Sequence, residues 1–266
     1  MHSVKYQNPT KYHQLTEGIR TLQDIQGYLI WRNVLYARPK LPENTKPIIV
    51  VPGFLADDDS TLIIREVLKH LGANVQGWGL GTNFGIRVHL ITGLAKLIRK
   101  VSDETNQKVT LIGHSLGGVF SKELAKMFPT HIEQVISLGS PLFDKEGDSS
   151  SISEIYKMFN PNKLNEKLLP IEHKFEDNFE QLPECLMTSI YSKADGIVQW
   201  KASLLPQGKL TQNIEVDCSH CGMANAPAVI YLLTHLVAQS SDKKFTPNML
   251  EKMFLKSGFE SEMPNI

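Results

Sequence analysis

One serine lies in a setting that would make its hydroxyl group a nucleophile. Ser115 is the third residue of GHSLGG (113–118), which contains the pattern G-x-S-x-G. The pattern follows the apolar run 108–112 and precedes a helical run that begins near Val119. A turn between a strand and a helix exposes such a serine, and the small residues Gly113 and Gly117 let the backbone turn tightly. The sequence therefore predicts that Ser115 is a catalytic nucleophile.

This serine needs partners elsewhere in the chain. A serine hydroxyl is a weak nucleophile at neutral pH, so it requires a histidine base and a carboxylate that orients the histidine. Around such a turn, the acid and then the histidine follow the serine along the chain. His220 lies between a predicted strand and a helix, whereas the later His235 is inside that helix. We expect His220 to be the base, and we expect His114 to pack or to contact substrate.

Two aspartates compete for the role of the acid. Asp195 lies just past the predicted strand that ends at Tyr191 and is followed by the small residue Gly196. A carboxylate at the end of a strand is well placed to meet the imidazole. Asp144 follows the preceding strand and its loop, a position that some hydrolases use for the acid. Position favours Asp195, and Asp144 stays the alternative.

Two backbone N–H groups are candidates for binding the negative oxygen of the reaction intermediate. The N–H of Leu116 lies at the N-terminus of a helix, where the helix dipole favours negative charge. The second donor is expected in the loop after the first parallel strand, within VPGFL (51–55), and we choose the N–H of Phe54. The alternative is that Pro52-Gly53 only turns the chain. This chemistry requires no metal and no organic cofactor.

Short apolar strands alternate with helices along most of the chain. Strands are expected at about 47–51, 73–78, 108–112, 134–138, 186–191 and 213–216, and helices at about 61–71, 88–105, 119–128 and 227–238. This alternation is typical of parallel βαβ units. We expect a single domain over residues 1–266 with an α/β fold, in which helices flank a mostly parallel sheet of about six strands.

Two segments fall outside this alternation. Residues 15–36 predict a helix whose apolar side faces the core. Its apolar positions are Leu15, Ile19, Leu22, Ile25, Leu29 and Tyr36. A membrane-surface helix is the alternative, but the polar side is not rich in lysine or arginine. The stretch 142–183, with three successive serines and scattered prolines, is either a lid or cap over the sheet or a surface connector.

Composition excludes some classes of partner. Lysine plus arginine and aspartate plus glutamate both number 28, so no net charge attracts nucleic acid or an anionic membrane. The first residues lack the basic-then-apolar layout of a secretory signal, and no apolar run is long enough to span a membrane. We expect no nucleic-acid partner and no transmembrane segment, although transient contact with a lipid interface stays open. A cytoplasmic location is favoured, a secreted mature form stays open, and the oligomeric state is not determined.

With these pieces in place, the chain resembles the α/β-hydrolase superfamily and, within it, the bacterial lipase-like esterases. The matching stretches are VPGFLADDDST, GWGLGTNFG, GHSLGGVFSKELA, SLGSPL, SIYSKADGIVQWKAS and SHCGMANAPAVIYLL. The resemblance implies hydrolysis of a small-molecule or lipid ester through an acyl-enzyme, with Ser115, Asp195 and His220 as the catalytic triad. Many relatives have His-Gly where this chain has Pro52-Gly53, which bears on the donor assigned to Phe54.

Three other functions stay open. An acyltransferase or a thioesterase would use the same triad. A binding or scaffold protein could use the same fold without catalysis. The run Cys218-Ser219-His220-Cys221 lies between a strand and a helix, so a thiol–disulfide redox protein that uses Cys218 and Cys221 is the alternative from another class. That alternative leaves the settings of Ser115 and Asp195 unexplained, so we favour the ester hydrolase.

Overall fold

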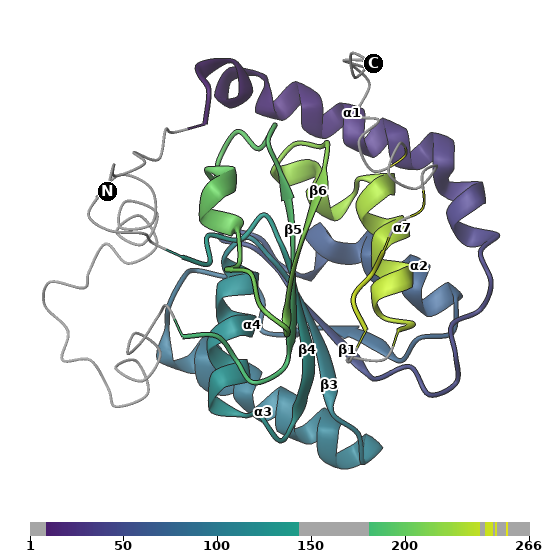
Figure 1. Cartoon of the computed structure of the whole chain (residues 1–266), viewed down its shortest axis with the longest axis vertical. Helices are drawn as coiled ribbons and strands as arrows, with labels where there is room; N and C mark the ends of the chain where they lie inside the picture. Colours follow the sequence, from purple (N-terminus) through teal and green to yellow (C-terminus); the bar gives the residue numbers. More distant parts are fainter. Residues whose placement is uncertain (1–8, 144–180, 240–242, 247, 249–253, 255–266) are drawn as a thin grey trace, which may run out of the picture.

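The central feature of the computed structural model is a sheet of six parallel strands in the order β2-β1-β3-β4-β5-β6 (Figure 1). The model describes residues 9–143, 181–239, 243–246, 248 and 254. The strands are β1 (Ile48–Val51), β2 (Val75–Gly77), β3 (Val109–His114), β4 (Ile132–Leu138), β5 (Leu186–Ser192) and β6 (Thr211–Val216). The predicted α/β fold with about six strands is therefore confirmed.

Helices cover both faces of the sheet. They are α1 (Lys11–Tyr36), α2 (Leu62–His70), α3 (Val88–Thr105), α4 (Leu116–Met127) and α7 (Pro227–Leu236), with short 3-10 turns η1 (Asp58–Thr61), η2 (Trp200–Ser203) and η3 (Cys221–Ala224). Figure 1 shows α3 and α4 on one side and α2 and α7 on the other. Alternate residues of β1 therefore enter different core clusters, with Ile48 and Val50 in one and Ile49 and Val51 in the other. A strand covered on both faces is a continuous apolar run.

Helix α4 begins earlier than expected, at Leu116 rather than near Val119. Its first turn contains Gly117 and Gly118, residues that destabilise helices in isolation. Here they permit close packing, because a Cβ on Gly117 would lie 2.3 Å from the carbonyl oxygen of Val51, and one on Gly118 would lie 2.0 Å from Ser140 Oγ. Tertiary contact therefore overrides local propensity, and the helix begins directly after Ser115.

The orientation of α1 contradicts the prediction for this segment. The helix forms, but Leu15, Ile19 and Leu22 are between 63% and 84% exposed, and Leu29 is 57% exposed. The prediction that this apolar side faces the core is wrong. The buried residues of α1 are Glu17, Gly27, Tyr28 and Leu35. The physical reason is that loops at the carboxyl end of the sheet present N–H groups to the acidic side of the helix, which turns that side inward.

The predicted lid or connector at 142–183 lies mostly outside the described residues, and so does the rival acid Asp144. At its beginning, Leu142 and Phe143 are buried, and both of their N–H groups donate to the carbonyl oxygen of Ala202. Among the helices in the described part of the chain, none has the length and apolar character that crossing a bilayer requires.

Candidate active site

Ser115 forms a sharp turn at the carboxyl end of β3. Its backbone angles are φ 51° and ψ −121°, and its N–H donates to the carbonyl oxygen of Leu138 at 2.8 Å. A positive φ is strained for a residue with a side chain, and such strain persists only where the surrounding structure holds it. The strand before it and the helix after it are the setting of a nucleophile elbow. Ser115 is therefore held in a conformation that a nucleophilic serine requires.

Glycines allow this turn to pack tightly. A Cβ on Gly113 would lie 2.4 Å from backbone atoms of Gly117 and Gly118, so the turn closes on itself. A Cβ on Gly53 would lie 3.2 Å from Ser115 Cβ. The loop that follows β1 therefore lies directly against the serine, as a loop that supplies an oxyanion donor must.

Asp195 and His220 are in direct contact. Asp195 Oδ2 and His220 Nδ1 are 2.6 Å apart, and both side chains are almost fully buried. The other carboxylate oxygen, Oδ1, accepts the N–H groups of Ile197 at 2.8 Å and Val198 at 2.7 Å. These hydrogen bonds fix the carboxylate in the turn that follows β5. Since Nδ1 of the imidazole bonds to the carboxylate, Nε2 is the ring nitrogen left to exchange a proton.

The electrostatic surroundings of His220 favour its protonated form. Burial by itself lowers the pKa of this imidazole, but the charge and hydrogen bond of Asp195, together with the charge of Glu17, raise the pKa above its ordinary value. A carboxylate that stabilises an imidazolium in this way is what a general base needs as it takes a proton. The pair is therefore suited to proton transfer.

His114 links the serine turn to the histidine loop. It precedes Ser115 in the chain, its ring lies 5.2 Å from the ring of His220, and its Nε2 is 2.9 Å from the carbonyl oxygen of His220. Burial and then the neighbouring His220 lower the pKa of His114 to about 4, so this ring is neutral near pH 7. Its Nε2–H group therefore donates a hydrogen bond to that carbonyl oxygen. Of the two roles expected for His114, the structure shows packing, and this packing brings His220 close to the serine turn.

The two predicted oxyanion donors belong to the residue that follows Ser115 and to the loop that follows β1. Leu116 is the first residue of α4, where N–H groups have no partner within the helix. Phe54 lies in the loop that contacts Ser115, and the next residue, Leu55, has φ 57° and donates its N–H to the carbonyl oxygen of Asn83 at 2.8 Å. Their roles as donors stay predictions.

Sequence reasoning missed Asn83, which holds this loop in place. The side chain of Asn83 is fully buried and donates to the carbonyl oxygen of Pro52 at 2.9 Å. Its only signal in the sequence is an amide residue within the glycine-rich run GWGLGTNFG. Sequence reasoning also missed Glu17 and Asp24, polar residues of the predicted helix 15–36 that lie against the loops of Asp195 and His220.

The environment of the cysteines disfavours the redox alternative. Cys218 is buried, Cys221 is exposed, and both are free thiols. Burial and then the charge of Asp24 raise the pKa of Cys218 well above its ordinary value, and burial and then Glu17 raise that of Cys221 to about 11. Reactive thiols have a lowered pKa and positive neighbours. The carboxylates around Cys218 and Cys221 instead raise the pKa of both thiols, which disfavours the reactive thiolate form.

The sequence is similar to known hydrolase-like proteins. The family model of the PGAP1-like alpha/beta domain matches residues 86–198, which include Ser115 and Asp195. A human protein described as a serine hydrolase-like protein is 24% identical over 164 residues, which cover 58% of this chain and 78% of that protein.

Solved structures have the same fold. Lipase B of Aspergillus fumigatus aligns with a TM-score of 0.55 at 16% identity, over 79% of this chain and 58% of that chain. A monoacylglycerol lipase of Paleococcus ferrophilus aligns with a TM-score of 0.52 at 17% identity, over 75% of this chain and 96% of that chain. The chain therefore has the fold of these lipases, and its sequence is similar to the PGAP1-like alpha/beta domain and to a serine hydrolase-like protein.

Proposed function

We propose that the protein hydrolyses carboxylic esters through an acyl-enzyme on Ser115, with His220 as the base and Asp195 as the residue that orients it. The observation that carries the proposal is the buried 2.6 Å contact between Asp195 Oδ2 and His220 Nδ1, at the same edge of the sheet as the strained Ser115. The similar lipases and serine hydrolase-like proteins support an ester as the substrate class.

The proposed reaction has two halves. His220 Nε2 takes the proton of Ser115 Oγ as that oxygen attacks the ester carbonyl carbon. The N–H groups of Phe54 and Leu116 bind the resulting oxyanion. The intermediate collapses, the alcohol leaves with the proton from His220, and the acyl group stays on Ser115. Water then attacks the acyl-enzyme with His220 again as base, which releases the carboxylic acid and restores the serine.

Active-site labelling tests the nucleophile. A fluorophosphonate probe should label the folded wild-type protein at Ser115, and Ser115→Ala should abolish both labelling and p-nitrophenyl ester hydrolysis, by more than about 10⁴-fold in kcat. The unfolded wild-type protein serves as the control, since an ordinary serine hydroxyl does not react. Absence of labelling in the folded wild-type protein, or full activity in Ser115→Ala, would refute the proposal. A series of acyl-chain lengths then distinguishes short-chain from lipid esters.

A further inference from the structure

The inward side of α1 touches the loops of both Asp195 and His220. Glu17 is 8% exposed, and its Oε1 accepts the N–H of Cys221 at 2.8 Å while its Oε2 accepts the N–H of Gly196 at 3.1 Å. Cys221 directly follows His220, and Gly196 directly follows Asp195. A single carboxylate therefore joins the turn of the acid to the loop of the base.

A second carboxylate on the same side of α1 holds the other flank of His220. Asp24 Oδ2 accepts the N–H of Ser219 at 2.9 Å and its hydroxyl at 2.6 Å. Ser219 directly precedes His220. Residues 17 and 24 lie about two helical turns apart, so both carboxylates project from one side of the helix. The residues before and after His220 are therefore both bonded to α1.

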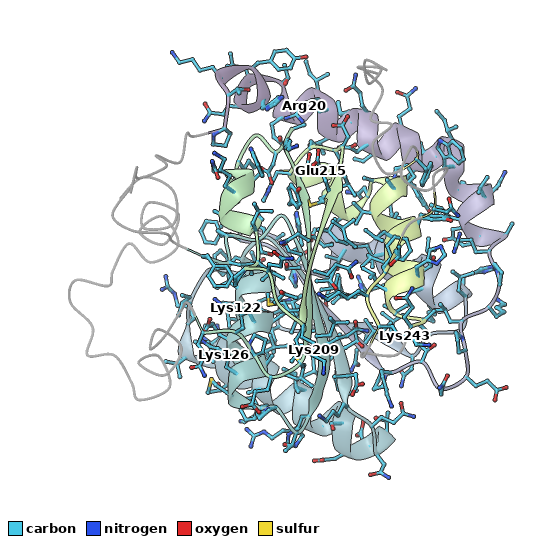
Figure 2. The ribbon with its side chains drawn as sticks, viewed as in Figure 1. Arg20, Lys122, Lys126, Lys209, Glu215 and Lys243 are labelled. Atoms are coloured by element: carbon cyan, nitrogen blue, oxygen red, sulfur yellow. The ribbon has the colours of Figure 1, made fainter. Side chains whose placement is uncertain are left out.

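Two glycines allow α1 to come this close. A Cβ on Gly196 would lie 2.4 Å from the carbonyl oxygen of His13, and a Cβ on Gly222 would lie 2.0 Å from Asp24 Oδ2. Figure 1 shows α1 across the end of the molecule, beyond β5 and β6, and Figure 2 labels Arg20 on it. Arg20 pairs with Glu17 at 3.0 Å and balances its charge. The absence of a side chain at Gly196 and Gly222 therefore leaves room for the acidic side of α1.

We propose that Glu17 and Asp24 are positioning residues that hold the loops of His220 and Asp195 in the geometry of the proposed triad. The inference rests on the proposed function, because it concerns the same acid and base. Neither carboxylate contacts the reacting atoms. Their effect is to fix the position of the imidazole, and small displacements of a catalytic group reduce turnover strongly.

Substitutions at the two carboxylates test this role against a matched control. Glu17→Ala removes both acceptors and should lower kcat by about 10- to 100-fold, with KM changed by less than about twofold. Asp24→Ala should also lower kcat, and Asp24→Asn should restore most of it, because an amide oxygen still accepts from Ser219. Glu66→Gln, the same kind of change on the exposed side of α2, should leave kcat unchanged. Glu17→Gln and Asp24→Asn keep the experiment informative if the alanine variants do not fold.

The pH dependence of kcat/KM is a second measurement. Loss of a purely structural contact would not shift its acid limb. Groups around His220 include Asp195 after β5, His114 on β3, Glu17 and Asp24 on α1, and the neighbouring Cys218 and Cys221. The negative charge of Glu17 raises the pKa of His220. Glu17→Gln should therefore lower that pKa and move the acid limb of kcat/KM to lower pH.

The outcomes separate this inference from the proposed function. If the wild-type protein is labelled at Ser115 while all the Glu17 and Asp24 variants match Glu66→Gln in kcat and in pH profile, the positioning role is wrong and the proposed function stands. If Ser115 in the wild-type protein is not labelled, the proposed function itself fails.

The outward side of α1 is apolar, and this observation is independent of the two inward carboxylates. Seven apolar side chains, each at least 51% exposed, form an outer stripe along the helix: Tyr12, Leu15, Ile19, Leu22, Leu29, Ile30 and Val34. The only acidic residues of α1, Glu17 and Asp24, face the opposite way, while the exposed Lys11 and Arg32 are cationic. The polar side of α1 is not rich in lysine or arginine, but the exposed apolar surface has two flanking cations and no exposed carboxylate, which is compatible with the boundary of a lipid surface that contains anionic lipid.

Further apolar side chains lie around the candidate active site. Leu55 and Phe84 are 63% and 56% exposed on the two loops joined by the Leu55–Asn83 hydrogen bond, and Ile197 is 47% exposed beside Asp195. These loops follow β1, β2 and β5 at the same edge as Ser115. A second copy of the chain would need two apolar heptad rows for a seam between helices. Positions 15, 22 and 29 are all Leu, but positions 19, 26 and 33 are Ile, Gln and Asn, which interrupts the second row.

We infer that the outer stripe of α1 docks the protein on a lipid surface, from which the proposed lipid ester substrate would enter. Docking is measured without turnover, so its failure and that of the proposed function are distinct. The wild-type protein should cosediment with vesicles of ether-linked phosphatidylcholine, and more strongly when ether-linked phosphatidylglycerol is added. The triple variant Leu15→Gln, Ile19→Gln and Leu22→Gln should bind at least about tenfold more weakly, because it replaces three of the seven exposed apolar side chains by polar ones.

Controls identify other occupants of the stripe. Leu210→Gln changes an exposed leucine just before β6, at the amino ends of the strands and so away from the end that carries Ser115. This variant should bind vesicles as the wild type does. The triple variant should keep wild-type kcat on a water-soluble ester. Light scattering that shows a wild-type dimer, absent in the triple variant, would identify a second copy as the occupant and overturn the inference. Wild-type protein that does not bind either kind of vesicle would also overturn it.

Discussion

The serine turn and the acid and base loops are held in place by different means. Ser115 is fixed by close packing of the main chain, because Gly113 lies against Gly117 within the turn and Gly117 lies against the carbonyl oxygen of Val51 in the neighbouring strand β1. The loops of Asp195 and His220 are fixed by side chains of α1, through hydrogen bonds that join residues 179 and 204 positions apart. The nucleophile therefore depends on main-chain packing at the sheet, and the base depends on side chains of a distant helix. Perturbing each region should give a different result.

Neutralising the acid should have the largest effect in the loop region. Asp195→Asn should lower kcat by about 10⁴-fold, because the amide no longer stabilises the imidazolium or fixes its tautomer. The measurement is p-nitrophenyl ester hydrolysis. Asp144→Asn is the control and should reduce kcat far less. Equal losses in the two variants would remove the reason to prefer Asp195.

Adding a methyl group to a glycine in each region should separate stability from activity. In Gly117→Ala the new Cβ meets the carbonyl oxygen of Val51 in β1, which cannot move without breaking the sheet, so we expect the free energy of unfolding to fall by about 3 kcal/mol. In Gly222→Ala the new Cβ meets side-chain atoms of Asp24 and Ser219, at the surface of the sheet's loops and not within its backbone, so α1 can shift outward. That variant should lose less than about 1.5 kcal/mol while its kcat falls. Urea denaturation measures the free energy of unfolding, and ester hydrolysis by the folded variants measures kcat. A larger loss of stability in Gly222→Ala than in Gly117→Ala would contradict the difference between the two regions.

The pH dependence of activity should report the state of His220. The imidazole must be neutral to act as a base, and its pKa is raised above its ordinary value by Asp195 and Glu17 against the effect of burial. Activity should therefore be lost as the pH falls through that raised pKa, with kcat/KM decreasing about tenfold per pH unit on the acid limb. The limb should lie above the ordinary imidazole pKa of 6.5. A limb below that value would mean that burial outweighs the two carboxylates.

Changing the exposed thiol should have the smallest effect. Cys221→Ser keeps the backbone N–H that donates to Glu17, so kcat should stay within about twofold of the wild type. Esterase activity measured before and after thiol alkylation of the wild type gives the companion result. Loss of esterase activity both in Cys221→Ser and after alkylation of the wild type would favour the redox alternative.

The sequence by itself determined the strands, the serine turn and the order in which the candidate residues follow it. Apolar runs of strand length and glycines beside Ser115 are local signals, and local geometry is what such signals encode. The preference for Asp195 came from its position after a strand, and the structure brings that carboxylate to His220.

Only the tertiary structure decided which side of α1 faces inward. The spacing of Leu15, Ile19 and Leu22 predicts a buried apolar side, but the cost of burying a carboxylate is offset when it accepts hydrogen bonds from N–H groups that would otherwise lack partners. Those N–H groups belong to residues 196, 219 and 221, far away in the chain. A pattern within one helix carries no information about such distant donors, and so the sequence could not reveal that α1 supports the acid and the base.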